Sequence, residues 1–291
     1  PGGARVAFWV APNIEYYELD PPVNPYRKAW PQPYPALPGY SIRDYGNRVG
    51  HIRQMEVLDR YGVRGSISLS TALCEHHPEI IAMCAERDWE FFSHGIYNTR
   101  YTYGMSVEQE RDMIRDSMET IQRHTGQHCA GYLAPALSHS ELTLDLFAEV
   151  GTELAGDDAG IYTCDLFHDD QPTPIHLRSG KAFVSVPYSL EMNDTIAYVV
   201  NKIEPRRYGQ MLRDNFDRLY QEGETSGTVM CIPTHNYQVS CPHRLRAFEE
   251  ALEYITGHSE VWVTTGREIA RHFIDHYYQQ CADDIATRGV G

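Results

Sequence analysis

Short runs of β-branched and aromatic residues alternate with amphipathic stretches along almost the whole chain. The runs have the length of buried strands, and the stretches between them have the apolar period of helices. We expect strands at Val6–Val10, Gly65–Leu69, Glu90–Ser93, Cys129–Leu133, Glu153–Ala155, Phe183–Pro187, Thr228–Pro233 and Val261–Thr264. We expect helices at Tyr45–Tyr61, Pro78–Arg87, Val107–Thr125, Ser140–Val150, Pro205–Glu222, His243–Thr256 and Arg267–His276. This alternation predicts an α/β protein with a parallel sheet.

Seven or eight such units favour closure of the sheet into a (β/α) barrel-like domain, a distorted TIM barrel. The chain has 291 residues, and a barrel of this kind takes about 250 residues, so we expect one domain over residues 1–291. The segment Asp20–Tyr40 differs from the rest because it holds seven prolines and four aromatic residues. We expect a loop there, neither helix nor central strand. The loop either packs on its own aromatics or forms a wall over the active site or a subunit contact.

Charge and cysteine usage exclude several functions. The formal net charge is −15, which argues against a nucleic-acid partner and against binding to an anionic membrane. No apolar run approaches the ~18 residues of a membrane span. The seven cysteines are scattered and form no C-x-x-C pair, so we expect no thiolate zinc knuckle and a reducing compartment. Because Pro1–Ala4 shows no signal-peptide pattern, we expect a cytoplasmic protein.

Polar side chains follow the expected strands at their C-terminal ends, which is where barrel enzymes carry their chemistry. They are Asn13, Glu15, His94, Asn98, Asp157, Asp158, Glu191, Asn193, His235 and Asn236. A single residue of this kind is more often a capping residue than a functional one. Several at one rim of a barrel indicate a site.

Four segments stand in an order that resembles the polysaccharide-deacetylase superfamily. They read SHGIYNT, GYLAPALS, VPYSLEMND and the long run from Thr234 to Phe273 that begins THNYQVSCPHR. Within that superfamily they are most similar to the ring-opening branch, the allantoinases and cyclic imide hydrolases. The resemblance spans Arg5 to Phe273. It implies a barrel fold, hydrolysis of carbon–nitrogen bonds other than peptide bonds, and a homo-oligomer, either a dimer or a tetramer.

The resemblance also shows where this chain departs from the pattern. Metal-dependent relatives bind zinc or another divalent ion through one Asp after the first strand and two His spaced i,i+4 after the third. Here Glu15 follows the first strand, and the His pair is replaced by His94 and Asn98. At most two ligands remain, Glu15 and His94, so we expect no tightly bound metal, with zinc as the alternative. The Arg expected two residues before Pro135 is Leu133.

The resemblance and the chemistry of amide hydrolysis suggest a role for each candidate. Glu15 is the expected base, and burial would raise its pKa towards ~6 from about 4.3. His235 would protonate the leaving nitrogen, and His94 is the third catalytic candidate. His94, Asn98 and Asn13 would donate to the carbonyl or ring. The remaining substrate-binding candidates, which would hydrogen-bond ring N–H groups or line the site, are Asp157, Glu191, Asn193 and Tyr188.

Three functions remain open from the sequence. The leading hypothesis is a hydrolase that opens a small cyclic amide, imide or ureide without a tightly bound metal. The first alternative is a metal-dependent N-deacetylase of an acetylated sugar. The second is a non-catalytic binding protein on the same scaffold, which Leu133 and Asn98 favour. The presence of Glu15, His94 and His235 favours an enzyme with a small-molecule substrate.

Overall fold

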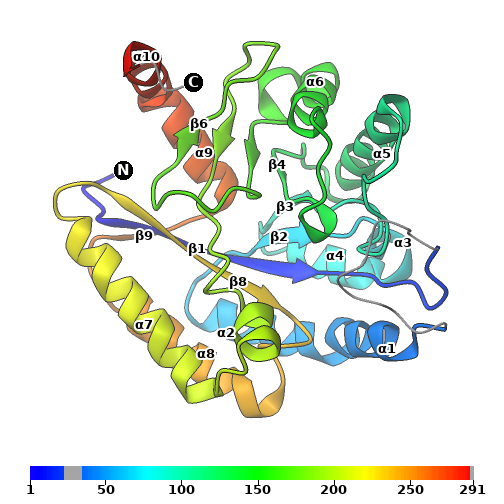
Figure 1. Cartoon of the computed structure of the whole chain (residues 1–291). Helices are drawn as coiled ribbons and strands as arrows, with labels where there is room; N and C mark the ends of the chain where they lie inside the picture. Colours follow the sequence, from blue (N-terminus) through cyan, green and yellow to red (C-terminus); the bar gives the residue numbers. More distant parts are fainter. Residues whose placement is uncertain (23–34, 289–291) are drawn as a thin grey trace.

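The computed structural model describes residues 1–22 and 35–288. Its strands form a curled sheet in the order β6-β7-β5-β4-β3-β2-β1-β8, and β9 also pairs with β1 (Figure 1). All the pairings are parallel except that of β6 with β7. The bounds are β1 Val6–Ile14, β2 Ser66–Leu69, β3 Glu90–Ser93, β4 Gly131–Tyr132, β5 Tyr162–Thr163, β6 Thr173–Pro174, β7 Val184–Ser185, β8 Thr228–His235 and β9 Val261–Val263. This confirms the predicted distorted (β/α) barrel.

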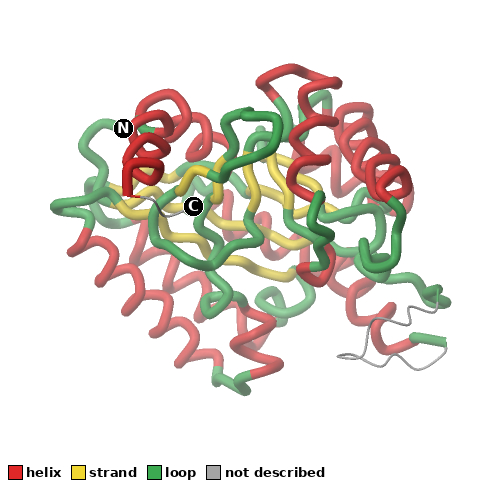
Figure 2. The backbone as a smooth tube through the Cα atoms, turned by 45° about the horizontal axis from the view of Figure 1, so that its top comes forward, coloured by secondary structure: helices red, strands yellow, loops and turns green. Residues whose placement is uncertain are grey.

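The helices flank the sheet (Figure 2). The α-helices are α1 Leu37–Tyr45, α2 His51–Arg60, α3 Leu73–His76, α4 Pro78–Ala85, α5 Val107–Thr125, α6 Thr143–Ala155, α7 Pro205–Glu222, α8 Pro242–Thr256, α9 Gly266–His276 and α10 Tyr278–Arg288. Short π or 3-10 turns are η1 Gly46–Gly50, η2 Pro135–Leu137, η3 Gly156–Asp158 and η4 Ile196–Val200. Among the described helices, none has the length and apolar character needed to cross a bilayer.

The expected strand at Glu153–Ala155 is wrong, because these residues form the last turn of α6. The helix continues through Gly151, where the sequence suggested a stop. A Cβ at Gly151 would lie 2.7 Å from the Cα of Gly160. Glycine is therefore required here for close packing against the following loop and does not end the helix. The strand of this unit comes later, as β5.

The proline-rich segment also differs from its prediction at its C-terminal end. α1 begins at Leu37 and carries Pro38 in its first turn, so the expectation that Leu37–Tyr40 is non-helical is wrong. Proline is tolerated there because the first N–H groups of a helix have no intrahelical partner. Residues 23–34, the greater part of the predicted loop, lie outside the described residues.

The period of two along the strands decides which side chains reach the interior of the barrel. Trp9 and Ala11 of β1 belong to an apolar cluster on the inner face of the sheet, whereas Phe8 and Val10 pack in the cluster shared with the outer helices. The same alternation places Phe92, Val229 and Cys231 on the inner face. At the C-terminal ends of three strands the same alternation continues with polar side chains, Asn13 and Glu15 after Ala11, His94 after Phe92 and His235 after Cys231.

A buried carboxylate, that of Glu90, lies at the opposite end of the barrel, where the strands begin. Glu90, the first residue of β3, accepts hydrogen bonds from Ser66 Oγ at 2.8 Å, Tyr162 OH at 2.8 Å and the backbone N–H of Arg267 at 2.9 Å. Arg267 lies in the first turn of α9, where a negative charge stabilises the positive end of the helix dipole. Glu90 therefore joins three elements far apart in sequence.

Candidate active site

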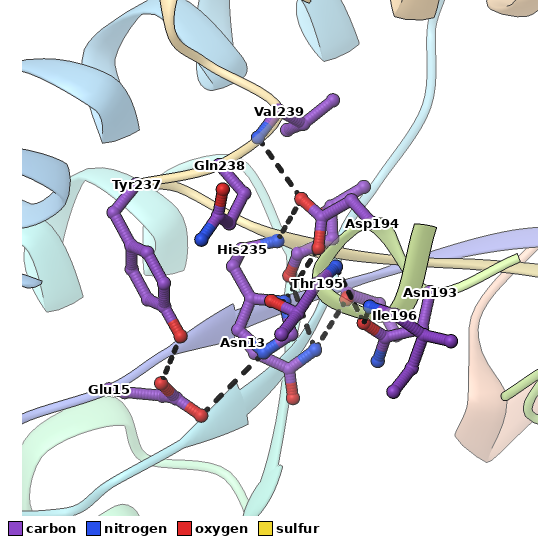
Figure 3. Close-up of polar contacts among 12 residues, drawn as sticks. Asn13, Glu15, Asn193, Asp194, Thr195, Ile196, His235, Tyr237, Gln238 and Val239 are labelled. Atoms are coloured by element: carbon purple, nitrogen blue, oxygen red, sulfur yellow. Dashed lines mark hydrogen bonds and ion pairs between the residues drawn. The ribbon is translucent and has the colours of Figure 1, made fainter. Parts of the chain in front are cut away.

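Glu15 is the centre of the polar cluster at the C-terminal end of the strands. It follows β1 and is 4% exposed. Asn98 Nδ2 donates to its Oε1, and Tyr237 OH donates to its Oε2 at 2.5 Å. His94 Nε2 lies 3.6 Å from the same Oε1. His235 Nε2 lies 3.7 Å from it (Figure 3). The structure thus brings together the three residues predicted to be catalytic, from the ends of β1, β3 and β8.

His235 is oriented by a carboxylate that the sequence analysis did not assign. Asp194 is fully buried, and its Oδ1 lies 2.7 Å from His235 Nδ1. Its Oδ2 accepts from the backbone N–H groups of His235 and Val239 at 2.8 and 3.0 Å (Figure 3). Because a carboxylate only accepts, Nδ1 carries a proton and Nε2 faces Glu15. The signal in the sequence was an acidic residue soon after the predicted strand Phe183–Pro187, one position beyond Asn193.

Glu15 and His235 shift each other's pKa in opposite directions. Burial acts to raise the pKa of Glu15, but His235, then His94 and Arg43, hold that pKa well below its ordinary value. The expected rise towards 6 is therefore wrong, because charged and donating neighbours outweigh desolvation. Burial acts to lower the pKa of His235, but Asp194 and then Glu15 raise it to about 9. At neutral pH the pair is a carboxylate facing an imidazolium.

His94 Nδ1 and the amide N–H groups of Asn98 donate to protein acceptors, although both residues were expected to donate to the substrate. His94 Nδ1 lies 2.8 Å from the carbonyl oxygen of Leu133, so this nitrogen carries the proton. His94 Nε2 faces Glu15 Oε1. The amide N–H groups of Asn98 go to Glu15 and, at 3.2 Å, to Tyr17 OH. Its Oδ1 is buried without a hydrogen-bond partner, which leaves an acceptor for a ligand N–H.

Three predicted substrate-binding residues use their polar atoms within the protein. Asn13 Nδ2 donates to Tyr188 OH at 2.9 Å, and both residues are buried. Asn193 Oδ1 accepts from the backbone N–H of Thr195 at 2.9 Å, immediately before η4. Asn13 and Tyr188 therefore tie β1 to the segment after β7, and Asn193 fixes the turn that carries Asp194.

The placement predicted for two acidic residues is corrected. Asp157 lies in η3, which precedes β5, so it is at the end of the barrel opposite Glu15. Its carbonyl oxygen accepts from Arg271 of α9. The error follows from the wrong strand at Glu153–Ala155. Glu191 is exposed and lines a cavity beside Tyr188, outside the cluster around Glu15.

The residues at the metal position that the resemblance implies do not fit a three-ligand metal site. Within residues 1–22 and 35–288, no group of three His, Cys, Asp or Glu side chains could hold an ion. The reason lies in the donor set: Asn98 turns its amide N–H₂ towards Glu15, and an amide nitrogen has no lone pair to give a metal. Only Glu15 and His94 of the expected ligands remain.

Asn98→His is expected to increase the affinity of the site for zinc. The substitution would place a second imidazole beside Glu15 and His94 and complete a ligand set that zinc accepts. We expect zinc retention after dialysis, measured by elemental analysis, to rise about 10-fold or more. Asn98→Gln is the matched control, since it changes the side chain without adding an imidazole. Equal zinc content in the two variants would contradict this account of the site.

Comparison with known proteins gives one family match and one curated relative. Residues 44–155 match the family model described as polysaccharide deacetylase. The peptidoglycan deacetylase of Helicobacter pylori is 25% identical over 262 residues, covering 79% of this chain and 85% of that protein. The matched region contains His94, Asn98 and Leu133, and it begins after Glu15.

Two solved structures share the fold over nearly the whole chain. The Puue allantoinase structure is 24% identical with a TM-score of 0.81, over 95% of this chain and 93% of its own. A probable polysaccharide deacetylase from Pseudomonas aeruginosa is also 24% identical, with a TM-score of 0.79 over 95% and 93% of the two chains. At this level of identity the two structures establish the barrel and leave the substrate open.

Proposed function

We propose that this chain, which carries a polysaccharide-deacetylase domain and is a hydrolase of carbon–nitrogen bonds other than peptide bonds, removes the acetyl group from an N-acetylated sugar. The family match and the similarity to a peptidoglycan deacetylase support this substrate class. It was the alternative in the sequence analysis, and these similarities favour it over ring opening.

The observation that carries the proposal is the pair formed by Glu15 and His235. The two groups lie 3.7 Å apart, one with a lowered pKa and the other with a pKa raised to about 9. When the surroundings of two titratable groups move their pKa values apart in this way, one group is suited to act as a base and the other as an acid. At neutral pH both are already in the state that amide hydrolysis requires.

The reaction follows from this geometry. Glu15 Oε1 and His94 Nε2 lie 3.6 Å apart, and a water molecule would bind beside both of them. As the water oxygen bonds to the acetyl carbon, its proton passes to Glu15. His235 Nε2–H then protonates the nitrogen as the C–N bond breaks, giving acetate and a free amine. The proton on Glu15 returns to His235 across the short gap between them.

Opening of a cyclic amide, imide or ureide is the second candidate. The similarity to the Puue allantoinase structure favours it, as does Asn98, which occupies the third ligand position while leaving the pair of Glu15 and His235 intact. The same base and acid would cleave a ring C–N bond, and both fragments would remain in one product. In either reaction we propose that the site works without a tightly bound metal.

Product mass separates the two reactions. The protein would be incubated with N-acetylated sugars, peptidoglycan fragments, allantoin, hydantoins and cyclic imides, once after chelation and once with added zinc. A product that has lost its acetyl group supports deacetylation, and a product heavier by one water supports ring opening. Turnover by Glu15→Gln protein prepared in the same way would reveal a contaminating enzyme. No turnover of any substrate would favour a binding protein.

A further inference from the structure

Arg43 is a charged residue at the site that neither the motifs nor the family match includes. It lies in the last turn of α1, one residue before the matched segment. Its guanidinium carbon lies 3.8 Å from the centre of the Tyr17 ring and 4.5 Å from that of Tyr237. Its Nε is 3.8 Å from Glu15 Oε2. A planar cation held between two aromatic rings has little freedom to move away from the carboxylate.

The contacts divide the two oxygens of Glu15 into different environments. Oε2 accepts from Tyr237 OH and faces Arg43. Oε1 accepts from Asn98 and faces both imidazoles. The oxygen on the side of Arg43 is therefore anchored, and the other faces the proposed reaction centre. Arg43 Nε is buried without a hydrogen-bond partner, so it is available to Oε2 when the site tightens around a substrate.

We propose that Arg43 is a positioning residue that anchors Oε2 of Glu15, so that Oε1 is presented to the water that binds beside His94. This inference rests on the proposed function of Glu15 as the base. Position 133 cannot supply this cation, because Leu133 is buried in the inner apolar cluster. Arg43 of α1 instead places its guanidinium near Oε2 of Glu15, whereas His94 and His235 face Oε1.

Replacement of Arg43 by Ala should leave a slot between two tyrosine rings that free guanidinium can fill. We expect Arg43→Ala to lower kcat by about 10²-fold with a smaller change in KM, because the group acts on the base and not on the substrate. Millimolar guanidinium should restore part of kcat saturably. Arg43→Lys should lose less than Arg43→Ala, because it keeps the charge without the planar stack. Arg244→Ala is the matched control, since Arg244 stacks on Tyr198 at 4.3 Å, and its kcat should not respond to guanidinium.

A second measurement does not depend on turnover. Guanidinium at low millimolar concentration should raise the thermal midpoint of Arg43→Ala saturably, and much less in the double variant that also carries Glu15→Gln. If the natural chain hydrolyses no amide, the proposed function fails, and this thermal comparison still decides the placement of Arg43. A kcat for Arg43→Ala within about 3-fold of the natural chain's value would overturn the proposal, because removing an electrostatic group at the reaction centre costs far more. Equal stabilisation of the single and double variants would overturn it too.

Discussion

Glu15→Gln is expected to lower kcat by about 10²–10³-fold. Glutamine has the shape of glutamate but carries no charge and accepts no proton from water. Its amide nitrogen would also face a donor in either orientation, because Asn98 donates to one oxygen of Glu15 and Tyr237 to the other. Steady-state kinetics on whichever substrate the product survey identifies would measure the loss, with circular dichroism to verify folding.

Glu90→Gln is the matched control for this variant. Glu90 is as buried as Glu15 and is also surrounded by donors, but it lies at the other end of β3 from His94. We expect the control to lower the free energy of unfolding, because a buried acceptor of three hydrogen bonds is disturbed, and to leave kcat close to that of the natural chain. Normal turnover by Glu15→Gln would remove Glu15 from the mechanism.

Asp194→Asn is expected to lower kcat by about 10²-fold or more and to shift the alkaline limb of the pH–rate profile to lower pH. Burial acts to lower the pKa of His235, and Asp194 with Glu15 raises it to about 9. In the natural chain, kcat/KM should therefore hold through neutral pH and fall above about pH 9, as His235 loses its proton. Without the charge of Asp194, the imidazole of His235 loses its proton at a lower pH. The enzyme then lacks its acid at pH values at which Glu15 is still ionised and able to act as the base.

The control for this variant is Asp165→Asn, which alters another buried carboxylate paired with a histidine. Asp165 Oδ2 lies 2.9 Å from His139 Nε2, and the other hydrogen bonds of this carboxylate come from Ala134 N–H and Thr163, not from Glu15 or His235. Its removal should leave the alkaline limb of the pH–rate profile in place.

The pH dependence of the free energy of unfolding gives an independent check of the direction of the pKa shift of His235. The folded pKa of His235 lies above its ordinary 6.5, so its contribution to stability is complete below pH 6.5 and is lost as the pH rises through about 9. An alkaline limb unchanged in Asp194→Asn would contradict the pairing.

The sequence by itself determined the barrel and three residues at its reactive rim. Local periodicity indicates the order of strands and helices, and the observed strands β1, β2, β3, β4, β7, β8 and β9 overlap strands predicted from it. The period of two along a strand also decides which side chains face inward. For this reason Glu15, His94 and His235 could be expected at one place before any contact was known. Their catalytic roles remain predictions that the variants above test.

Where a local pattern was weak, the prediction failed. The run Glu153–Ala155 has the length of a strand but continues the apolar face of α6, so Asp157 was assigned to the wrong end of the barrel. Gly151 resembles a helix stop, but the packing of Gly160 against it, which only the fold reveals, explains its presence.

Only the tertiary structure decided the electrostatics of the site. Arg43 reaches Glu15 from α1, and Tyr237 reaches it from the segment after β8. Asp194 reaches His235 from the segment before η4. No local spacing in the sequence indicates such contacts. These neighbours reverse the pKa shift expected for Glu15. The hydrogen bond from His94 Nδ1 to the carbonyl of Leu133 similarly uses within the protein an N–H group that was expected to reach the substrate. Burial alone could be anticipated from the sequence, but the sign of a pKa shift depends on which charges surround the buried group, and folding brings those charges together from distant parts of the chain.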